Sequence, residues 1–549
     1  MAKVALLVDD LRVSKYVKEL ADWLDSDPEM ELAGIVVHPA PQSSVTGWRK
    51  LVFLARTQGI YVTLSRIAFA LMARIERKLF LRAPVYRDHL ASFDLSSHAA
   101  PKVQTSPIVS TSGFVYRFPA EDVARVRALG ADVLVRCGNG ILKGEILSAS
   151  RCGIVSVHHG DNRVNRGGPA AFWEVFFRQA QTGFIVQRLT EELDGGEVLM
   201  RGSITTGLVY SLNQANLYAR TQLPLMRTIR AVADGRETTE EPFIYFHQLY
   251  RTPLLGETIR YVLKTLGFGV GKLVRRLLRY YWRWGVGYIA GDWRGAVLWR
   301  ARFIPNPPGH FLADPFAVEQ DGRRLIFLED FPYRTGKGVI SAYEILPDGR
   351  PERLGVVVEE DFHLSFPYLF RWNGELWMVP ESSAARQIRL YRCTSFPLQW
   401  TLERVLVDDV DAVDAMLFER EGRWWMMTTI NETAVGTNDS DFFLFEAETP
   451  LGPWRRVGDG PVFIDAGRGR NGGLLRDGER LYRVAQRPSF GQYGRAFSIY
   501  EIDRLDGGYA ETRKQDVEPL FLRGISGTHH LHHEAGLVTF DVVRNQRTG

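Results

Sequence analysis

Short apolar runs alternate with segments of helical spacing over the first 232 residues. Residues 3–8 and 31–37 are apolar runs of strand length, and between them apolar positions recur at helical spacing. This strand–helix–strand order predicts a parallel, doubly wound α/β sheet. In all, we expect strands over 3–8, 31–37, 132–135, 153–158 and 184–189, and helices over 13–25, 121–129 and 170–181.

A different pattern begins near Gly309. An apolar stretch, a turn containing glycine and an aromatic-rich strand recur together, most weakly in the last copy, and the turn glycines are Gly322, Gly374, Gly422, Gly478 and Gly536. Their spacing of roughly 50 residues is typical of propeller blades. Five copies predict an all-β five-bladed propeller, in which only short sheet edges stay open. A two-sheet sandwich is the alternative.

The segment between these regions is basic and amphipathic. From Leu255 to Arg283 it holds seven Lys or Arg and one acid, Glu257, and apolar residues alternate with the cations at helical spacing. We expect a cationic helix, interrupted near 267–271 and closed by the aromatic residues of 280–284. One interpretation is contact of 255–284 with an anionic membrane surface. The other is a linker helix with a solvated basic face. The stretch 48–82 is also helical and basic, and the sequence assigns it no role.

These patterns divide the chain into three parts. We expect an α/β domain over 1–245, a basic amphipathic linker over 246–295 and the propeller over 296–549. A chain of 549 residues exceeds one hydrophobic core, so several domains are expected in any case.

Composition narrows the function classes. The formal charge of +4 favours neither binding to nucleic acid nor binding to a strongly charged partner. The three cysteines have neither disulfide-framework nor metal-ligand spacing. Asp9 and Asp10 interrupt the first apolar run too early for a secretory signal, and no run of about 18 uncharged apolar residues predicts a membrane span. We therefore expect a cytoplasmic protein, at the inner face of the membrane if the basic linker binds lipid.

One set of motifs lies in the first domain. Residues 155–160 read Val-Ser-Val-His-His-Gly, 166–169 read Arg-Gly-Gly-Pro, 182–183 read Thr-Gly and 194–196 read Asp-Gly-Gly. This order resembles the formyltransferases that use 10-formyltetrahydrofolate, whose pattern is Asn-x-His, Arg-Gly-x-x-Pro, Thr-Gly and Asp-x-Gly. The resemblance implies that His158 handles the proton of the attacking amine, that Asp194 orients His158, and that 10-formyltetrahydrofolate is the formyl donor.

Formyl transfer to an amine fits these residue types. It passes through a tetrahedral oxyanion, which needs a base near neutral pH and a hydrogen-bond donor at the oxygen. The family asparagine is replaced by Ser156, so Ser156, Asn139, His159 or Asn162 is expected to supply that donor. The polar residues after His158 favour a hydroxyl-rich acceptor. We assign substrate binding to His159, Asn162, Arg166 and Gly167. No metal is required.

A second set of motifs lies in the repeats. Residues 311–316, 363–368, 380–383, 396–400, 450–454 and 470–473 resemble the N-terminal propeller domain of glucosamine inositolphosphorylceramide transferases, which is similar to family 43 glycosidases. That resemblance places Asp314 at the position of the glycosidase base. Glycoside cleavage needs two carboxyl groups. We expect Asp314, Glu381 and Asp414 to meet at the propeller axis, with Arg470 lining it. The histidines of 529–533 are expected to line the axis or close the ring.

Both resemblances suggest chemistry on amino sugars. The leading hypothesis is formyl transfer from 10-formyltetrahydrofolate to an amine, with an amino sugar of a glycan or glycolipid as acceptor and the propeller as the glycan-binding part. The alternatives are a glycosidase-like or glycosyl-transfer enzyme acting through the propeller carboxylates, and a non-catalytic carbohydrate-binding protein.

Overall fold

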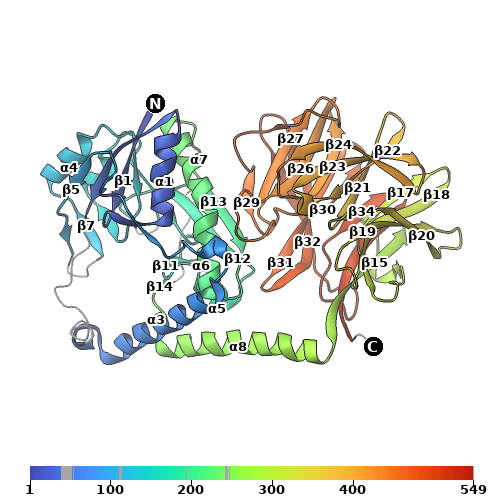
Figure 1. Cartoon of the computed structure of the whole chain (residues 1–549), viewed down its shortest axis with the longest axis horizontal. Helices are drawn as coiled ribbons and strands as arrows, with labels where there is room; N and C mark the ends of the chain where they lie inside the picture. Colours follow the sequence, from blue (N-terminus) through green and yellow to red (C-terminus); the bar gives the residue numbers. More distant parts are fainter. Residues whose placement is uncertain are drawn as a thin grey trace. The chain divides into compact units, whose positions relative to one another are not determined.

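The computed structural model describes residues 1–38, 52, 55–110, 114–192, 195–241, 245–246 and 248–547. The chain separates into two compact units (Figure 1). The first, N-terminal unit comprises residues 1–267 with 433–436, and the second, C-terminal unit comprises 268–432 with 437–549. No helix in the described part of the chain is long and apolar enough to span a membrane.

A mostly parallel sheet forms the centre of the N-terminal unit. Its order is β13-β12-β10-β8-β1-β3-β5, parallel from β10 to β5 and antiparallel from β10 to β13. The strands are β1 (Ala2–Val8), β3 (Met30–Val37), β5 (Lys102–Gln104), β8 (Val133–Arg136), β10 (Ile154–His158), β12 (Gln181–Arg188) and β13 (Glu197–Thr205). The carboxyl ends of the parallel strands meet at one edge, where His158 ends β10.

Alternation along β1 gives this sheet two buried faces. Val4 and Leu6 belong to a core that includes α1 and α7, whereas Ala5 and Leu7 belong to a core that includes α4. The helices are α1 (Lys15–Ser26), α3 (Ile60–Phe80), α4 (Ala120–Arg127), α5 (Trp173–Phe177), α6 (Tyr210–Arg220) and α7 (Gln222–Ala233). Smaller strands are β2 (Arg12–Ser14), β4 (Ser92–Asp94), β6 (Ile108–Val109), β7 (Val115–Arg117), β9 (Ile141–Lys143), β11 (Arg166–Gly167) and β14 (Leu249–Tyr250).

Tight hairpins build the C-terminal unit. At four of the repeated turns, Asp321-Gly322, Asn373-Gly374, Glu421-Gly422 and Ala535-Gly536, both central residues have positive φ, between 50° and 78°. Two consecutive positive φ angles define the hairpin turn whose twist matches that of the flanking strands. The first three turns each join the first two strands of a sheet: β17 (His310–Gln320) to β18 (Arg323–Pro332), β21 (Ser365–Trp372) to β22 (Glu375–Glu381), and β25 (Ala412–Arg420) to β26 (Arg423–Ile430).

Five antiparallel sheets are present among the described residues of this unit. Three continue from those hairpins, through β19 (Val339–Ile345) and β20 (Pro351–Val358), β23 (Gln387–Ser395) and β24 (Gln399–Asp408), and β27 (Asp441–Ala447), β28 (Arg455–Arg456) and β29 (Phe463–Asp465). The fourth is β30 (Asn471–Asp477), β31 (Arg480–Ser489), β32 (Gln492–Arg504) and β33 (Ala510–Val517). The fifth is β16 (Arg302–Phe303), β15 (Tyr280–Ala290), β35 (Leu537–Arg547) and β34 (Leu531–Glu534).

One edge strand of each sheet contributes to a closed ring. β17 contacts β21, β21 contacts β25, β25 contacts β30, β30 contacts β34, and β34 contacts β17. The five strands therefore surround a common axis, and the fifth sheet joins strands from both ends of this unit's sequence.

The segment 246–295 differs from the expected linker. α8 (Leu255–Leu277) runs without interruption through Gly267, Gly269 and Gly271. Residues 280–290, whose aromatic start was expected to close the helix, instead form β15, which pairs antiparallel with β35 along its whole length. Aromatic residues favour strands, and a long cross-strand partner outweighs the helical periodicity that precedes them.

The helix expected over 170–181 is also shorter than predicted. α5 covers only Trp173–Phe177, because Arg178 adopts left-handed φ and ψ of 57° and 42° and ends the helix. Gln181 already belongs to β12, which extends that strand toward the N-terminus relative to the expected 184–189.

Candidate functional site

His158 lies at the carboxyl end of β10, where sequence analysis placed the base. A hydrogen bond of 3.1 Å joins its Nε2 to the carbonyl oxygen of Asn165. Because a carbonyl only accepts, Nε2 carries a proton in this contact. Asp194, the predicted partner of His158, lies outside the described residues, so that pairing stays a prediction.

The glycines after position 194 are required by close packing. A Cβ at Gly196 would lie 2.3 Å from the carbonyl oxygen of Arg188 and 3.0 Å from Oε1 of Gln187. The turn therefore approaches β12 too closely for a side chain.

Ser156 and Gln187 lie on the same side of the sheet as His158. Ser156 is two residues before His158 on β10, and Gln187 of β12 is its direct cross-strand partner. Gln187 is only 3% exposed, and its Oε1 has no hydrogen-bond partner among the described residues. Sequence analysis missed Gln187 as a candidate, since only the strand register reveals that it faces Ser156.

Asn139 is held by Asp9 instead. Its backbone N–H and its side-chain amide donate to Oδ2 of Asp9 at 2.9 and 3.0 Å, and Arg136 donates to its carbonyl oxygen. The amide of Asn139 therefore already has an acceptor.

His159 packs against α6. Its ring stacks on Tyr218 with centroids 3.9 Å apart and planes within 6°, and its Nε2 lies 3.3 Å from the hydroxyl of Thr221. Burial, and then the neighbouring His158, lower the pKa of His159 to about 3. The ring is therefore neutral at physiological pH.

The predicted substrate-binding residues of 162–167 form a packed loop. Asn162 is 4% exposed and accepts from Arg166 through its carbonyl oxygen and from Arg201 through Oδ1, both at 3.1 Å. The Arg166 guanidinium lies 4.6 Å from the ring centre of Tyr245. Gly167 has a φ of +96° in β11, beside β14. These contacts shape the loop next to His158.

A buried carboxyl group adjoins His158 through Asn165. The side-chain amide of Asn165 donates to Oε1 of Glu174 at 2.5 Å, while its backbone oxygen accepts from His158. Burial raises the pKa of Glu174, and its Oε2 has no partner within the described part of the chain. Glu174 is a second residue that sequence analysis missed.

In the C-terminal unit, strand bulges aim side chains at the axis. Asp314, Phe366 and Asp414 occupy the same place in β17, β21 and β25, with φ of +49°, +44° and +51°. At each place the strand gains a residue relative to its hairpin partner. Such bulges redirect side chains. The carboxylates of Asp314 and Asp414 are thus set by one repeated backbone feature.

Arg470 joins two of the predicted carboxylates. Its Nε donates to Oδ2 of Asp414 at 2.5 Å, and its Nη2 donates to Oε2 of Glu381 at 3.1 Å. Gln486 donates to the same Asp414 oxygen at 3.0 Å, and the Arg470 guanidinium lies 5.0 Å from the ring centre of Tyr493. Glu381, Asp414 and Arg470 therefore form one charged cluster.

Asp314 adjoins this cluster from the other side. Its Oδ1 lies 3.5 Å from Nε2 of His529, whose Nδ1 lies 2.7 Å from Asp541. Burial raises the pKa of Asp314 to about 7, although the charge of His529 opposes this. Burial also raises the pKa of Glu381 well above its ordinary value, as it does for the nearby Glu329. The site therefore contains both protonated and ionised carboxyl groups near neutral pH.

His529, Asp314 and Asp541 offer ligand atoms within 4.8 Å of one another, so this trio is able to hold a metal ion. The histidines of 529–533 were expected to line the axis or close the ring, and His529, His530 and His532 are all buried there. Asp541 and Gln486 were not expected, since their places depend on strand pairing far along the chain.

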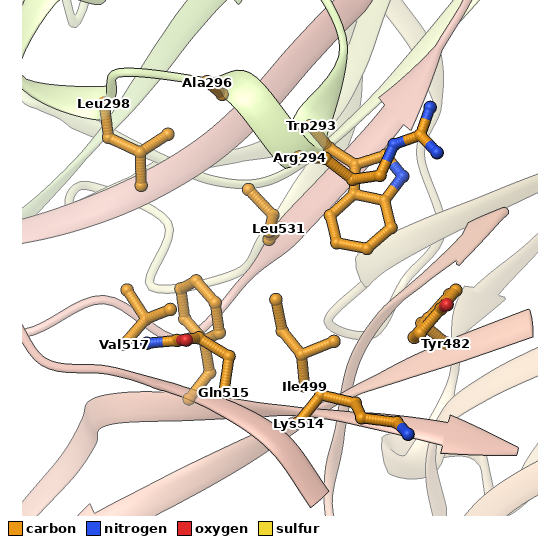
Figure 2. Close-up of a pocket in the computed structure, with 11 residues that line it drawn as sticks. Trp293, Arg294, Ala296, Leu298, Tyr482, Ile499, Lys514, Gln515, Val517 and Leu531 are labelled. Atoms are coloured by element: carbon orange, nitrogen blue, oxygen red, sulfur yellow. The ribbon is translucent and has the colours of Figure 1, made fainter. Parts of the chain in front are cut away.

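The tryptophans of the repeats lie away from the axial cluster. Trp377, Trp424 and Trp425 are at most 5% exposed and belong to the hydrophobic core of this unit. A separate pocket of about 340 Å³ includes Trp293, Arg294, Tyr482 and Lys514 in its wall (Figure 2). None of the axial carboxylates lines it.

Sequence comparisons relate each unit to a different group of proteins. Residues 302–518 match the family model described as glucosamine inositolphosphorylceramide transferase 1, N-terminal. Glucosamine inositolphosphorylceramide transferase 1 of Oryza sativa subsp. japonica is 36% identical over 202 residues, which cover 36% of this chain and 27% of the rice protein. The chain thus spans about a quarter of the length of that relative.

Methionyl-tRNA formyltransferase of Bacillus cereus (strain AH187) is 24% identical over 243 residues, covering 42% of this chain and 70% of that enzyme. Among solved structures, a thermostable family-43 glycoside hydrolase is similar at a TM-score of 0.31 and 14% identity, over 40% of this chain and 82% of its own. A TM-score of that size does not by itself identify a fold.

Proposed function

We propose that this chain is a transferase that formylates the amine of a sugar on a glycan or glycolipid. In this proposal the N-terminal unit is a formyltransferase-like α/β domain. The ring of five sheets is a five-bladed propeller that binds the glycan. The sequence similarity to a methionyl-tRNA formyltransferase supports the reaction type. The similarity to a glucosamine inositolphosphorylceramide transferase supports an amino-sugar glycolipid as the acceptor class.

One observation carries the proposal: the side chains of His158, Ser156 and Gln187 lie on the same face of the sheet, toward its carboxyl end. Ligands of open α/β sheets bind beyond the carboxyl ends of the strands. The amide of Gln187 is buried beside Ser156, which places its N–H group within the same part of the sheet as His158. When bound, 10-formyltetrahydrofolate would supply an electrophilic formyl carbon.

The chain's own residues would then move one proton and hold one oxygen. His158 accepts the proton that the amine loses as its nitrogen bonds to the formyl carbon, and returns it to the departing nitrogen of the donor as the bond between that nitrogen and the formyl carbon breaks. Gln187, through its side-chain N–H, donates to the formyl oxygen, with the Ser156 hydroxyl beside it. Asp194 keeps its predicted role of orienting His158. A positioned base increases the reaction rate by about 10²- to 10⁴-fold.

The axial cluster would recognise the sugar. The carboxyl groups of Glu381 and Asp314, whose pKa values burial raises, would donate hydrogen bonds to ring hydroxyls of the glycan. Arg470, which binds Glu381 and Asp414, would hold these groups in place. Arg470→Gln should therefore weaken binding of a glucosamine-containing glycan. It should leave binding of a folate analogue to the N-terminal unit unchanged, as measured by calorimetry.

The direct test is transfer of formyl groups to amino sugars. Wild-type protein, 10-formyltetrahydrofolate and glucosamine-containing acceptors should give an N-formyl product that His158→Ala fails to make. Turnover by His158→Ala at the wild-type rate would end the proposal.

A second candidate function is glycosidic-bond chemistry at the axial carboxyl groups. It is favoured by one specific observation: burial raises the pKa of Asp314 to about 7, whereas His529 holds the pKa of the nearby Asp541 below its ordinary value although burial opposes this. Acid–base catalysis needs carboxyl groups in different protonation states. Under this alternative Asp314→Asn abolishes turnover of a glycoside and His158→Ala does not. The opposite pattern supports formyl transfer.

A further inference from the structure

α3 carries a stripe of exposed apolar side chains along one face. Ile60, Leu64, Ile67, Leu71 and Ile75 recur every three to four residues, and each is between 41% and 69% exposed. The opposite face of the helix is buried through residues that include Met72, Ala73 and Glu76. Large aliphatic side chains in an ordered row on an outer helix face indicate a surface that contacts something apolar.

α8 repeats this arrangement. Ile259, Leu263 and Leu266 are between 51% and 63% exposed, and the same period continues through Val270, Leu273 and Leu277. Tyr261, on the other face, is only 1% exposed. The stripe therefore extends along the whole of α8.

The two helices are anchored to each other by their buried faces. Tyr261 of α8 donates its hydroxyl hydrogen to Glu76 of α3 at 2.5 Å, and the backbone N–H of Ser211 donates to the other carboxylate oxygen at 2.9 Å. The backbone N–H of Leu255 donates to Ser65 of α3 at 2.9 Å. Since both buried faces meet at Glu76, the stripe of α3 and the stripe of α8 as far as Leu266 both lie on the outside of the N-terminal unit.

Basic residues border both apolar stripes, and acidic residues are rare in the same segments. Residues 60–82 hold five Lys or Arg and 255–283 hold seven, while each segment contains one acid. The acid of α3, Glu76, is buried. Exposed cations on these helices include Arg66, Arg74 and Lys78 of α3 and Arg260, Lys272, Arg275 and Arg276 of α8. An apolar stripe bordered by cations complements the surface of an anionic bilayer, with its buried acyl chains and negative headgroups.

We propose that α3 and α8 together form a membrane-binding platform, whose two apolar stripes insert into the interface of an anionic lipid surface. α3, to which the sequence assigned no role, contributes half of the apolar contact. Neither helix crosses the bilayer. The proposal stands apart from the proposed function, because lipid binding needs neither a formyl donor nor a glycan.

Co-sedimentation with vesicles tests the platform. The full chain should bind vesicles of phosphatidylcholine mixed with phosphatidylglycerol and bind vesicles of phosphatidylcholine alone far less. Leu71→Asp and Leu263→Asp should each lower the partition coefficient about tenfold or more, because each removes a leucine from the apolar contact. Arg275→Glu combined with Arg276→Glu should weaken binding only to the anionic vesicles.

The matched control is Ile108→Asp. Ile108 is 68% exposed on β6 of the same unit, outside both stripes, and its substitution should leave vesicle binding unchanged. Circular dichroism checks folding, and Leu71→Ser and Leu263→Ser replace any aspartate variant that fails to fold. Wild-type protein that binds neither vesicle, or stripe variants that bind like wild type, would overturn the proposal. So would self-association without lipid that both stripe variants abolish, since a second copy would then cover the stripes.

Discussion

Gln187 lies directly opposite Ser156 on the antiparallel pair of β12 and β10. The amide that the formyltransferase pattern places on β10 is therefore available one strand away, on a side chain that is almost fully buried. In the proposed formyl transfer, Gln187 would take the place of the asparagine that Ser156 replaces.

Replacing Gln187 tests whether its amide does the work of the asparagine that Ser156 replaces. Gln187→Leu removes the proposed donor and should lower the kcat of formyl transfer by about 10²- to 10³-fold, the usual effect of losing one oxyanion donor. Ser156→Asn, added to Gln187→Leu, should recover much of the loss because it restores an amide on β10. A Gln187→Leu enzyme with unchanged kcat would show that the donor lies elsewhere.

Features that depend on neighbouring residues alone, such as tight turns, can be predicted from the sequence. Gly322, Gly374 and Gly422 mark hairpins, since only a few residue types tolerate positive φ in the turns. The resemblance to family 43 glycosidases pointed to Asp314, and in the structure Asp314 and Asp414 share one place in the first and third sheets.

Other features depend on pairing between distant segments. Gln187 becomes a candidate only through its register with Ser156, and His529 meets Asp314 from 215 residues away because β34 closes the ring. β15 was missed for the same reason, since its partner β35 lies at the other end of the sequence.

Arg470 should stabilise the C-terminal unit. Its side chain is 19% exposed and pairs with Asp414 and Glu381, whose side chains are 2% and 12% exposed. Arg470→Met leaves both carboxyl groups without their cation and should lower the free energy of unfolding by about 3–5 kcal/mol. Arg350→Met is the control, because its pair with Asp348 is exposed to solvent and should contribute little to stability. Urea titrations of both variants measure the difference; equal losses would contradict the assignment.

The buried Asp314 should make stability depend on pH. Its pKa of about 7 in the folded chain exceeds its ordinary value of 3.8, so the folded state keeps a proton that the unfolded chain loses between those values. The free energy of unfolding should therefore fall as pH rises from about 4 to about 7, by at most about 1.4 kcal/mol per pH unit for one proton.

Asp314→Asn should remove this component, which unfolding titrations across that range would reveal. Asp321→Asn, at an exposed turn with positive φ that asparagine tolerates, should keep the wild-type profile. Identical pH profiles for wild type and Asp314→Asn would contradict the buried, proton-bearing carboxyl group.

Gly167 should be intolerant of a side chain. Its φ is +96°, and a Cβ would lie 2.2 Å from the carbonyl oxygen of Tyr250, against which β11 pairs. Gly167→Ala should lower the midpoint of thermal unfolding and reduce formyl transfer, because the loop that it distorts adjoins His158. Gly235 has a φ of +64°, but a Cβ there would meet open space. Gly235→Ala should therefore lower the free energy of unfolding by only about 1–2 kcal/mol. Equal effects of the two substitutions would rule out the steric argument.

The central claim is that His158 acts as the base in formyl transfer to an amino sugar. The decisive measurement is mass spectrometry of glucosamine-containing acceptors incubated with 10-formyltetrahydrofolate and either wild type, His158→Ala or His159→Phe. We predict an N-formyl product with wild type and with His159→Phe, which keeps the ring stacked on Tyr218, and no enzymatic product with His158→Ala. An N-formyl product formed equally by His158→Ala, or by none of the three proteins, would contradict the account.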